Sequence, residues 1–200
     1  MKPIIILILT SCMVLNTITM TYQKAYGATG TAPFSVTVNG SLVLTDASND
    51  TMSGKDPTIN VALSVTPDLG ATTVSDTANF RIRSNQNVWR LTAQKTSSNT
   101  GGTGLTDSDI TLNISKSAGS KANTNAGTLV SPFNNATTIG SIPSSSTANV
   151  VSGTAKTSSG RDSANTDNYF QVNTTYSVVP DFFYTPGTFS TTITYNLVSP

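Results

Sequence analysis

Hydrophobic and polar residues alternate with a period of two along most of the chain, in runs separated by turn-forming residues. This alternation is typical of β-strands that lay one face on a core and the other in solvent. No run has a convincing helical period, so we predict an all-β protein. We expect strands in the runs Phe34 to Leu44, Ile59 to Val65, Phe80 to Ile82, Trp89 to Ala93, Ile110 to Ile114, Phe170 to Val178 and Phe189 to Leu197.

The runs are about as many as the seven strands of an immunoglobulin-like antiparallel β-sandwich, which is the fold we expect. The first run is either one long strand or two short ones hinged at Asn39-Gly40, because Gly40 falls among the inward positions. The runs around Phe80 and Trp89 are joined by Ser84-Asn85-Gln86-Asn87, which predicts a hairpin with Trp89 inside.

A long stretch rich in Ser, Thr, Asn, Gly and Ala extends from Ser115 to Asp167, with weak apolar pieces only at Leu129-Val130 and Val150-Val151. Loops of this length are unusual inside a compact domain. We therefore expect it to contain short edge strands together with an exposed excursion.

The beginning of the chain has the layout of a secretory signal peptide. Lys2 precedes the apolar stretch Ile4 to Met20, and small residues follow at Ala25 and Gly27. We expect residues 1–27 to be the signal peptide, residues 28–40 an N-terminal extension, and residues 41–200 the β-sandwich. Acylation of Cys12 in a lipoprotein box is the alternative, although the residues after Cys12 are apolar and form no polar tether.

The composition points away from nucleic acids and anionic membranes. Only 10% of the residues are charged and the net charge is +1, so neither partner is implied. After Gly27 the chain has no cysteine, and an exported domain of this kind must hold its core without disulfides. No second apolar run is long enough to span a bilayer.

Residues that carry catalysis or bind metals are scarce. The chain has no histidine, which excludes the usual hydrolase triads and zinc sites. The close carboxylate pairs, Asp107 with Asp109 and Asp162 with Asp167, lie among turn formers, and turn formation explains them. A calcium site at Asp162, Asn165 and Asp167 is the weaker interpretation, since the spacing is not that of a calcium loop. We expect no enzyme, metal or cofactor.

Three arginines are candidates for a surface-binding site. Arg81, Arg83 and Arg90 should all point away from the core of the predicted hairpin, making a basic stripe for an acidic glycan or a partner subunit. The simpler explanation is that charges on a sheet surface block unwanted strand pairing. Trp89 is in phase with Leu91 and Ala93 and is therefore expected in the core, where it offers no sugar-stacking platform.

Several segments resemble one family of secreted proteins. The segment Ala32 to Asp46 is similar to the N-terminus of alternate-chaperone (colonisation-factor type) fimbrial major subunits. Ile59 to Pro67 followed by Phe80 to Lys95 is similar to that family's second strand and charged hairpin. Tyr184 to Leu197 resembles the start of the terminal strand in pilin-like domains.

The resemblance implies donor-strand complementation, in which the N-terminal extension of one subunit completes the sandwich of the next. It implies a homopolymer on the cell surface, assembled with a periplasmic chaperone and an outer-membrane usher. The alternative is that Phe34 to Val38 pairs within its own chain. The donor side chains would be Phe34, Val36 and Val38, and the receiving core would be lined by Trp89, Ile193, Tyr195 and Leu197.

Two other interpretations remain. Trp89-Arg90-Leu91 is a Trp-x-Leu triplet, and Thr192 to Leu197 looks like the second motif of WxL cell-wall-binding domains with Tyr195 in place of tryptophan. That resemblance implies a cell-wall-associated surface protein. A secreted carbohydrate-binding β-sandwich is the third interpretation, and it requires exposed aromatic residues.

Overall fold

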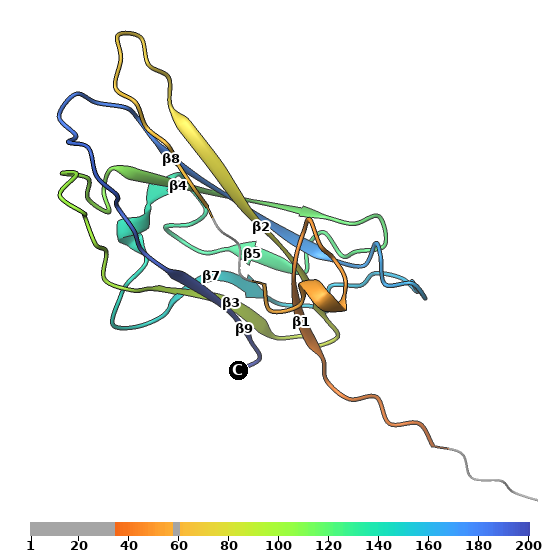
Figure 1. Ribbon diagram of the computed structural model, residues 1–200. Coiled ribbons are helices and arrows are strands. Elements are labelled where there is room, and N and C mark those ends of the chain that lie inside the picture. Colours follow the sequence, from red (N-terminus) through yellow and green to blue (C-terminus); the bar gives the residue numbers. More distant parts are fainter. Residues whose placement is uncertain (1–34, 58–60) are drawn as a thin grey trace, which may run out of the picture. The chain divides into compact units, whose positions relative to one another are not determined.

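The computed structural model describes residues 35–57 and 61–200 (Figure 1). The predicted signal peptide, Cys12, Phe34 and Ile59 lie outside the described residues. Within these ranges no helix is long and apolar enough to cross a membrane. The described residues form nine strands and two short 3-10 turns: β1 (Leu42–Asp46), η1 (Met52–Gly54), β2 (Val74–Ser84), β3 (Trp89–Lys95), β4 (Ile110–Ala118), β5 (Gly127–Leu129), β6 (Thr137–Thr138), η2 (Ile139–Ser141), β7 (Ala148–Gly153), β8 (Phe170–Val178) and β9 (Ile193–Val198).

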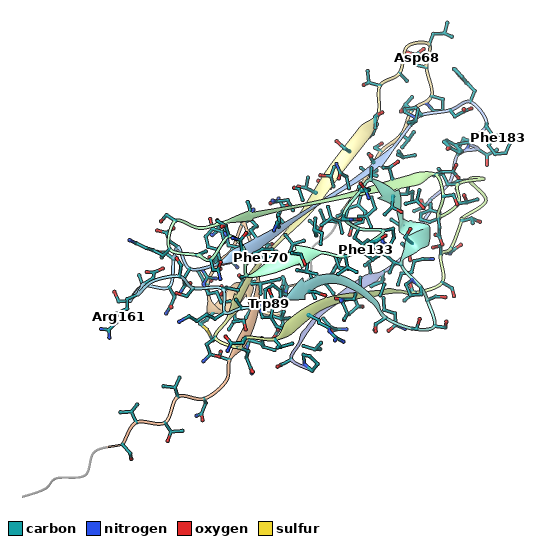
Figure 2. All side chains as sticks on the ribbon, turned by 180° about the vertical axis from the view of Figure 1, so that it is seen from behind. Asp68, Trp89, Phe133, Arg161, Phe170 and Phe183 are labelled. Carbon is teal, nitrogen blue, oxygen red and sulfur yellow. The ribbon has the colours of Figure 1, made fainter. Side chains whose placement is uncertain are left out.

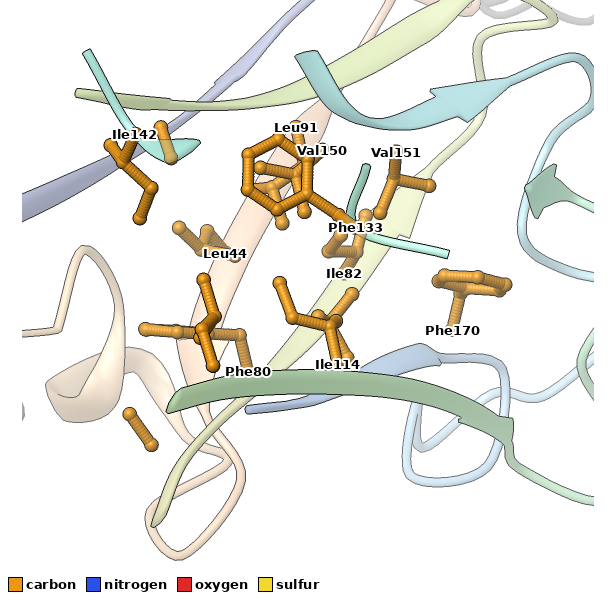
Figure 3. Packing of buried hydrophobic residues seen from close by; sticks show 14 of the residues in the cluster. Leu44, Phe80, Ile82, Leu91, Ile114, Phe133, Ile142, Val150, Val151 and Phe170 are labelled. Atoms are coloured by element: carbon orange, nitrogen blue, oxygen red, sulfur yellow. The ribbon is translucent and has the colours of Figure 1, made fainter. Parts of the chain in front are cut away.

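The strands make two sheets whose neighbours are all antiparallel. The first sheet has the order β1-β2-β8-β4-β6, and the second has the order β5-β7-β3-β9. The side chains that face inward from the two sheets form one core, as Figure 3 shows for Ile82, Leu91 and Phe170. The predicted all-β antiparallel sandwich is therefore confirmed, and β5, β6 and β7, which belong to none of the predicted runs, raise the strand number above the expected seven.

The predicted hairpin between the Phe80 and Trp89 runs is wrong. β2 pairs with β1 and β8, whereas β3 pairs with β7 and β9. The connection Asn85 to Val88 therefore crosses from one sheet to the other. An alternating pattern cannot distinguish the two arrangements, because both strands turn the same residues toward the same core. Trp89 is fully buried, as its phase predicted.

The polar stretch between Ser115 and Asp167 contains three strands of its own, β5, β6 and β7. The two short ones are edge strands, one in each sheet, and β7 lies inside the second sheet with Val150 and Val151 fully buried. The segment between β5 and β6 passes from one sheet to the other, and Phe133 on this segment is buried in the core (Figure 3). The chain's own residues thus close this side of the sandwich.

Trp89 packs against two glycines, Gly127 on β5 and Gly153 on β7. Its indole Nε1 donates a hydrogen bond to the carbonyl of Ala155 at 2.8 Å, and its ring meets Phe170 edge-on with a centroid distance of 5.6 Å. A Cβ added to Gly153 on β7 would lie 2.1 Å from the Trp89 ring atoms. Only glycine allows the indole to lie this close to the β7 backbone.

We predict that Gly153→Ala destabilises the sandwich by about 1 to 3 kcal/mol, because the new methyl group overpacks a fully buried ring. Gly160→Ala is the control, since a Cβ at Gly160 has no neighbour within 4 Å. Chemical denaturation of both variants measures the effect. Equal free energies of unfolding for the two variants would show that the Trp89 site has room for a methyl group.

Candidate functional site

One side of the sandwich is open along an elongated groove of about 1280 Å³. It lies between β1 at the edge of the first sheet and β9 at the edge of the second. Its floor consists of core side chains from several strands. The lining includes Leu42 and Leu44 of β1, Ala78 and Phe80 of β2, Ile110 of β4, Tyr176 and Val178 of β8, and Ile193, Tyr195 and Leu197 of β9.

The inward side chains of β9 lack the cover that other strands have. On β8, which lies between β2 and β4, every inward residue from Phe170 to Val178 is buried. On β9 the inward residues Ile193, Tyr195 and Leu197 are only half-buried. β9 pairs with β3 on one side, and among the described residues no strand pairs with its other side. The core therefore continues to an unpaired backbone edge.

The segment from Val61 to Pro67 lines the same groove. Its side chains alternate as the sequence predicted, with Val61, Leu63 and Val65 half-buried and the residues between them exposed. The predicted strand is nevertheless wrong, because these residues make no backbone ladder within the part of the chain that the structure describes. A single hydrogen bond of 3.1 Å, from the Ala62 amide to the Asp76 carboxylate, ties the segment to β2.

A pair of tyrosines joins the two sheets beneath the groove. The hydroxyls of Tyr176 and Tyr195 share a hydrogen bond of 2.9 Å, and the Tyr195 ring lies against Phe80 with a centroid distance of 4.9 Å. Burial raises the pKa of the Tyr195 hydroxyl well above its ordinary value. Both hydroxyls therefore stay neutral at physiological pH, and no charge lies in the groove floor at this point.

The structure brings most of the predicted receiving residues together. Ile193, Tyr195 and Leu197 line the groove. Trp89, which was expected with them, does not line it, because its side chain packs toward Gly127 and Gly153 on β5 and β7, on the side of β3 away from β9. The sequence did not identify Phe80 and Tyr176 as groove residues. Their inward phase was visible, but their place beside the open edge depends on the strand order.

The predicted donor residues belong to a unit separate from the sandwich. The described residues 35–38 fall in a different unit from Asn39–Pro200. Val36 and Val38 are exposed and lie in no strand.

The predicted arginine stripe is divided between the two sheets. Arg81 and Arg83 lie on the outer face of β2, while Arg90 lies on β3 and is exposed. The single stripe on one hairpin is therefore wrong, for the same reason as the hairpin itself. Arg81 and Arg83 also bind other side chains of the protein, which lowers their availability to an acidic partner.

Asp50 holds these two arginines. Arg83 binds the Asp50 carboxylate through two nitrogens at 2.6 Å each, and Arg81 binds it through one at 2.9 Å. The Thr45 hydroxyl donates a fourth hydrogen bond to the Asp50 carboxylate, and the Arg81 guanidinium lies 3.9 Å from the centre of the Tyr169 ring. Burial alone would raise the Asp50 pKa, but these hydrogen bonds outweigh it and hold that pKa far below its ordinary value. The cluster fixes the loop after β1 onto the sheet.

The carboxylates that the sequence paired are bound by other residues of the chain near them in sequence. Asp107 accepts hydrogen bonds from Lys95 and Ser98, while Asp109 accepts from the amide and hydroxyl of Thr106. Asp162 accepts from the Asp167 amide at 2.7 Å. These contacts agree with the role of turn formers. Among the described residues no group of three or more acidic, cysteine or histidine side chains gathers as a metal site.

Neither a scan against protein-family models nor a search of curated proteins finds a match to this chain.

We predict that Asp50→Asn lowers the free energy of unfolding by about 2 kcal/mol at neutral pH, because two part-buried arginines lose a charged acceptor. In the folded wild-type protein the pKa of the Asp50 carboxyl is below the ordinary 3.8. On acidification the unfolded chain therefore binds the proton first. The contribution of Asp50 is therefore full above about pH 5 and is lost as the pH falls below its ordinary pKa. Denaturant titrations from pH 7 to pH 2 measure it.

Asp56 is exposed and forms no ion pair with another described residue, so it supplies the control variant Asp56→Asn. The difference in free energy of unfolding between wild type and Asp50→Asn should narrow toward pH 2. The free energy of unfolding of Asp56→Asn should follow that of wild type throughout. A gap that stays constant with pH would show that the Asp50 charge contributes nothing to stability.

Proposed function

We propose that this chain is a non-enzymatic structural subunit of a bacterial surface fimbria, exported and then polymerised head-to-tail. In this proposal the N-terminal extension, residues 28–40, of one copy fills the open groove of the next copy as an added strand. The observation that carries the proposal is the open groove beside β9, where half-buried core residues meet an unpaired strand edge.

Strand addition suits this groove better than binding of a small ligand does. The groove runs along the whole of β9 and continues past its start to Tyr184. An added strand would pair with the free backbone edge of β9 while placing alternate side chains on the groove floor. It would thereby satisfy both the backbone groups and the apolar surface that the sandwich leaves uncovered.

The extension has the pattern that such a groove requires. Phe34, Val36 and Val38 alternate with Ser35 and Thr37, so one face of the extended segment is apolar and the other polar. Burying the three apolar side chains would contribute about 5 to 8 kcal/mol before the cost of ordering the segment. Backbone hydrogen bonds to the free edge of β9 would add to this contribution.

The assembly would grow because donor and acceptor are different surfaces. An extension and a groove form a heterologous contact, so each added copy presents a new groove or a new extension. Before assembly the unpaired edge of β9 would be a site of aggregation. A periplasmic chaperone that covers the groove, and an outer-membrane usher that receives the subunit, are the partners this proposal includes.

The alternative functions have less support than the fimbrial one. The triplet Trp89-Arg90-Leu91 that suggested a cell-wall domain has both apolar residues fully buried. A carbohydrate-binding face would need exposed aromatic rings. Trp89 is buried, whereas Phe182 and Phe183 are exposed; these two rings are assigned a different partner below. Export and a place at the cell surface are part of the proposal, because they follow from the predicted signal peptide.

We predict that Val36→Asp abolishes polymerisation, since a charge would have to enter an apolar groove. Thr37→Asp is the matched control, because Thr37 belongs to the opposite face of the extension. Unheated and boiled samples of the chain from Ala28 to Pro200 are compared on a denaturing gel. Wild type and Thr37→Asp should give a ladder that boiling removes, and Val36→Asp should give a monomer.

Deletion of Ala28 to Asn39 should also give a monomer, because the donor strand is then absent. A Val36→Asp ladder equal to that of wild type would contradict donor-strand assembly. A monomer from all variants, wild type included, would indicate a sandwich that functions without strand exchange.

A further inference from the structure

We propose that an exposed apolar surface at one end of the sandwich is a second contact between neighbouring copies in the polymer. We call this surface the apolar tip. It consists of Leu69, Phe182 and Phe183, which are 91%, 72% and 75% exposed. The inference rests on the proposed function, since its partner is a second copy of this chain. It adds an interface that the strand exchange alone does not require.

The strand register places the loops that carry these residues at the same end of the first sheet. Val74 at the start of β2 pairs with Val178 at the end of β8, so the loops carrying Leu69 and Phe183 leave the sheet at the same end. In Figure 2 the neighbouring Asp68 and Phe183 lie at this end. The other end of β2, Ser84, pairs with Leu42. Eleven residues of β2 separate the two ends by about 35 Å.

The apolar tip is built on turns with fixed geometry. The Phe183 amide binds the Asp181 carboxylate at 2.8 Å, the Tyr184 amide binds the Asp181 carbonyl, and the Thr185 amide binds the Thr103 carbonyl. Leu69 lies in a second turn, closed by the bond from Ala71 to the Asp68 carbonyl. The backbone that carries the exposed rings therefore loses little freedom when a partner covers them. Apolar residues held outward in this way mark contact surfaces.

The direction of the donor strand decides which end meets the next copy. β9 begins at the tip end, where Ile193 pairs with Lys95, and finishes at the other end, where Val198 pairs with Arg90. All strand pairs of the sandwich are antiparallel, and antiparallel pairing is the more stable kind. A donor antiparallel to β9 begins near Val198 and ends near Ile193. Its last residue, Asn39, then emerges beside the apolar tip.

The donor's own sandwich must then lie against that tip. Asn39 and Ser41 are both bonded to Asn85, through the Asn39 carbonyl and the Ser41 amide, so the extension leaves the donor sandwich without a long linker. The end of the donor that faces the tip carries the exposed Val88 and Val198. A donor parallel to β9 would instead emerge at the end where the acceptor's own extension begins, and two copies facing each other in this way favour a closed dimer. A donor antiparallel to β9, which emerges beside the apolar tip, gives an open filament.

The test compares the chain from Ala28 to Pro200 carrying Phe182→Ser and Phe183→Ser with wild type. Met52→Ser is the control, because Met52 is an exposed apolar residue, at 83%, that does not belong to the apolar tip. We expect the double variant to polymerise and to release subunits about tenfold faster on heating, since loss of aromatic contacts acts mainly on dissociation. Met52→Ser should release subunits at the wild-type rate.

A second measurement separates the tip from the groove. A synthetic peptide of Thr31 to Asn39 is titrated into the full chain carrying Val36→Asp, with and without the two serine substitutions. We expect equal peptide affinities, because the tip contacts the donor's sandwich and not its strand. Polymers of wild-type thermal stability from the double variant would overturn the proposal.

A loss of peptide affinity that matches the loss of polymer stability would also overturn the proposed end contact. The turn that carries Phe182 and Phe183 would then act through the groove. A wild-type chain that neither polymerises nor binds the peptide would contradict the donor-strand proposal itself, and the end contact with it. Failure of the end contact and failure of donor-strand assembly therefore give different results.

Discussion

The incomplete cover of β9 is the constraint on which the account of this protein depends. Its inward residues Ile193, Tyr195 and Leu197 belong to the same core as Phe80 and Tyr176, yet they remain half-buried beside a groove. The opposite side of the sandwich shows how the chain closes a gap when it supplies the residues itself, because Phe133 is buried there between β5 and β6. The difference between the two sides suggests that the groove is kept open for a strand.

The sequence predicted the layers of this fold better than their connections. Alternation identified β4, β8 and the inward residues of β9, because burial on one face imposes a period of two. It could not show that Ser84 and Trp89 belong to different sheets, since an arch and a hairpin give the same pattern. Phe133 and β7 were hidden because their neighbours are small polar residues, and a single apolar side chain gives no period.

The candidate site was predicted in part for the same physical reason. Ile193, Tyr195 and Leu197 were selected by phase and they line the groove, whereas Trp89 has the same phase and lies elsewhere. Phase determines which face a residue occupies, but position along the sheet depends on strand order. Asp50 could not be found at all, because nothing in a polar loop marks one aspartate as the partner of Arg81 and Arg83.

The most direct test of the account is amide hydrogen exchange along β9, measured by mass spectrometry on the assembled wild-type chain and on the Val36→Asp chain. The account predicts that the β9 amides pointing away from β3 exchange slowly in the assembled chain and quickly in the variant. The amides of β8, which have partners on both sides, should exchange alike in the two samples. Equal exchange along β9 in both samples would contradict the account, because its free edge would then have gained no strand on assembly.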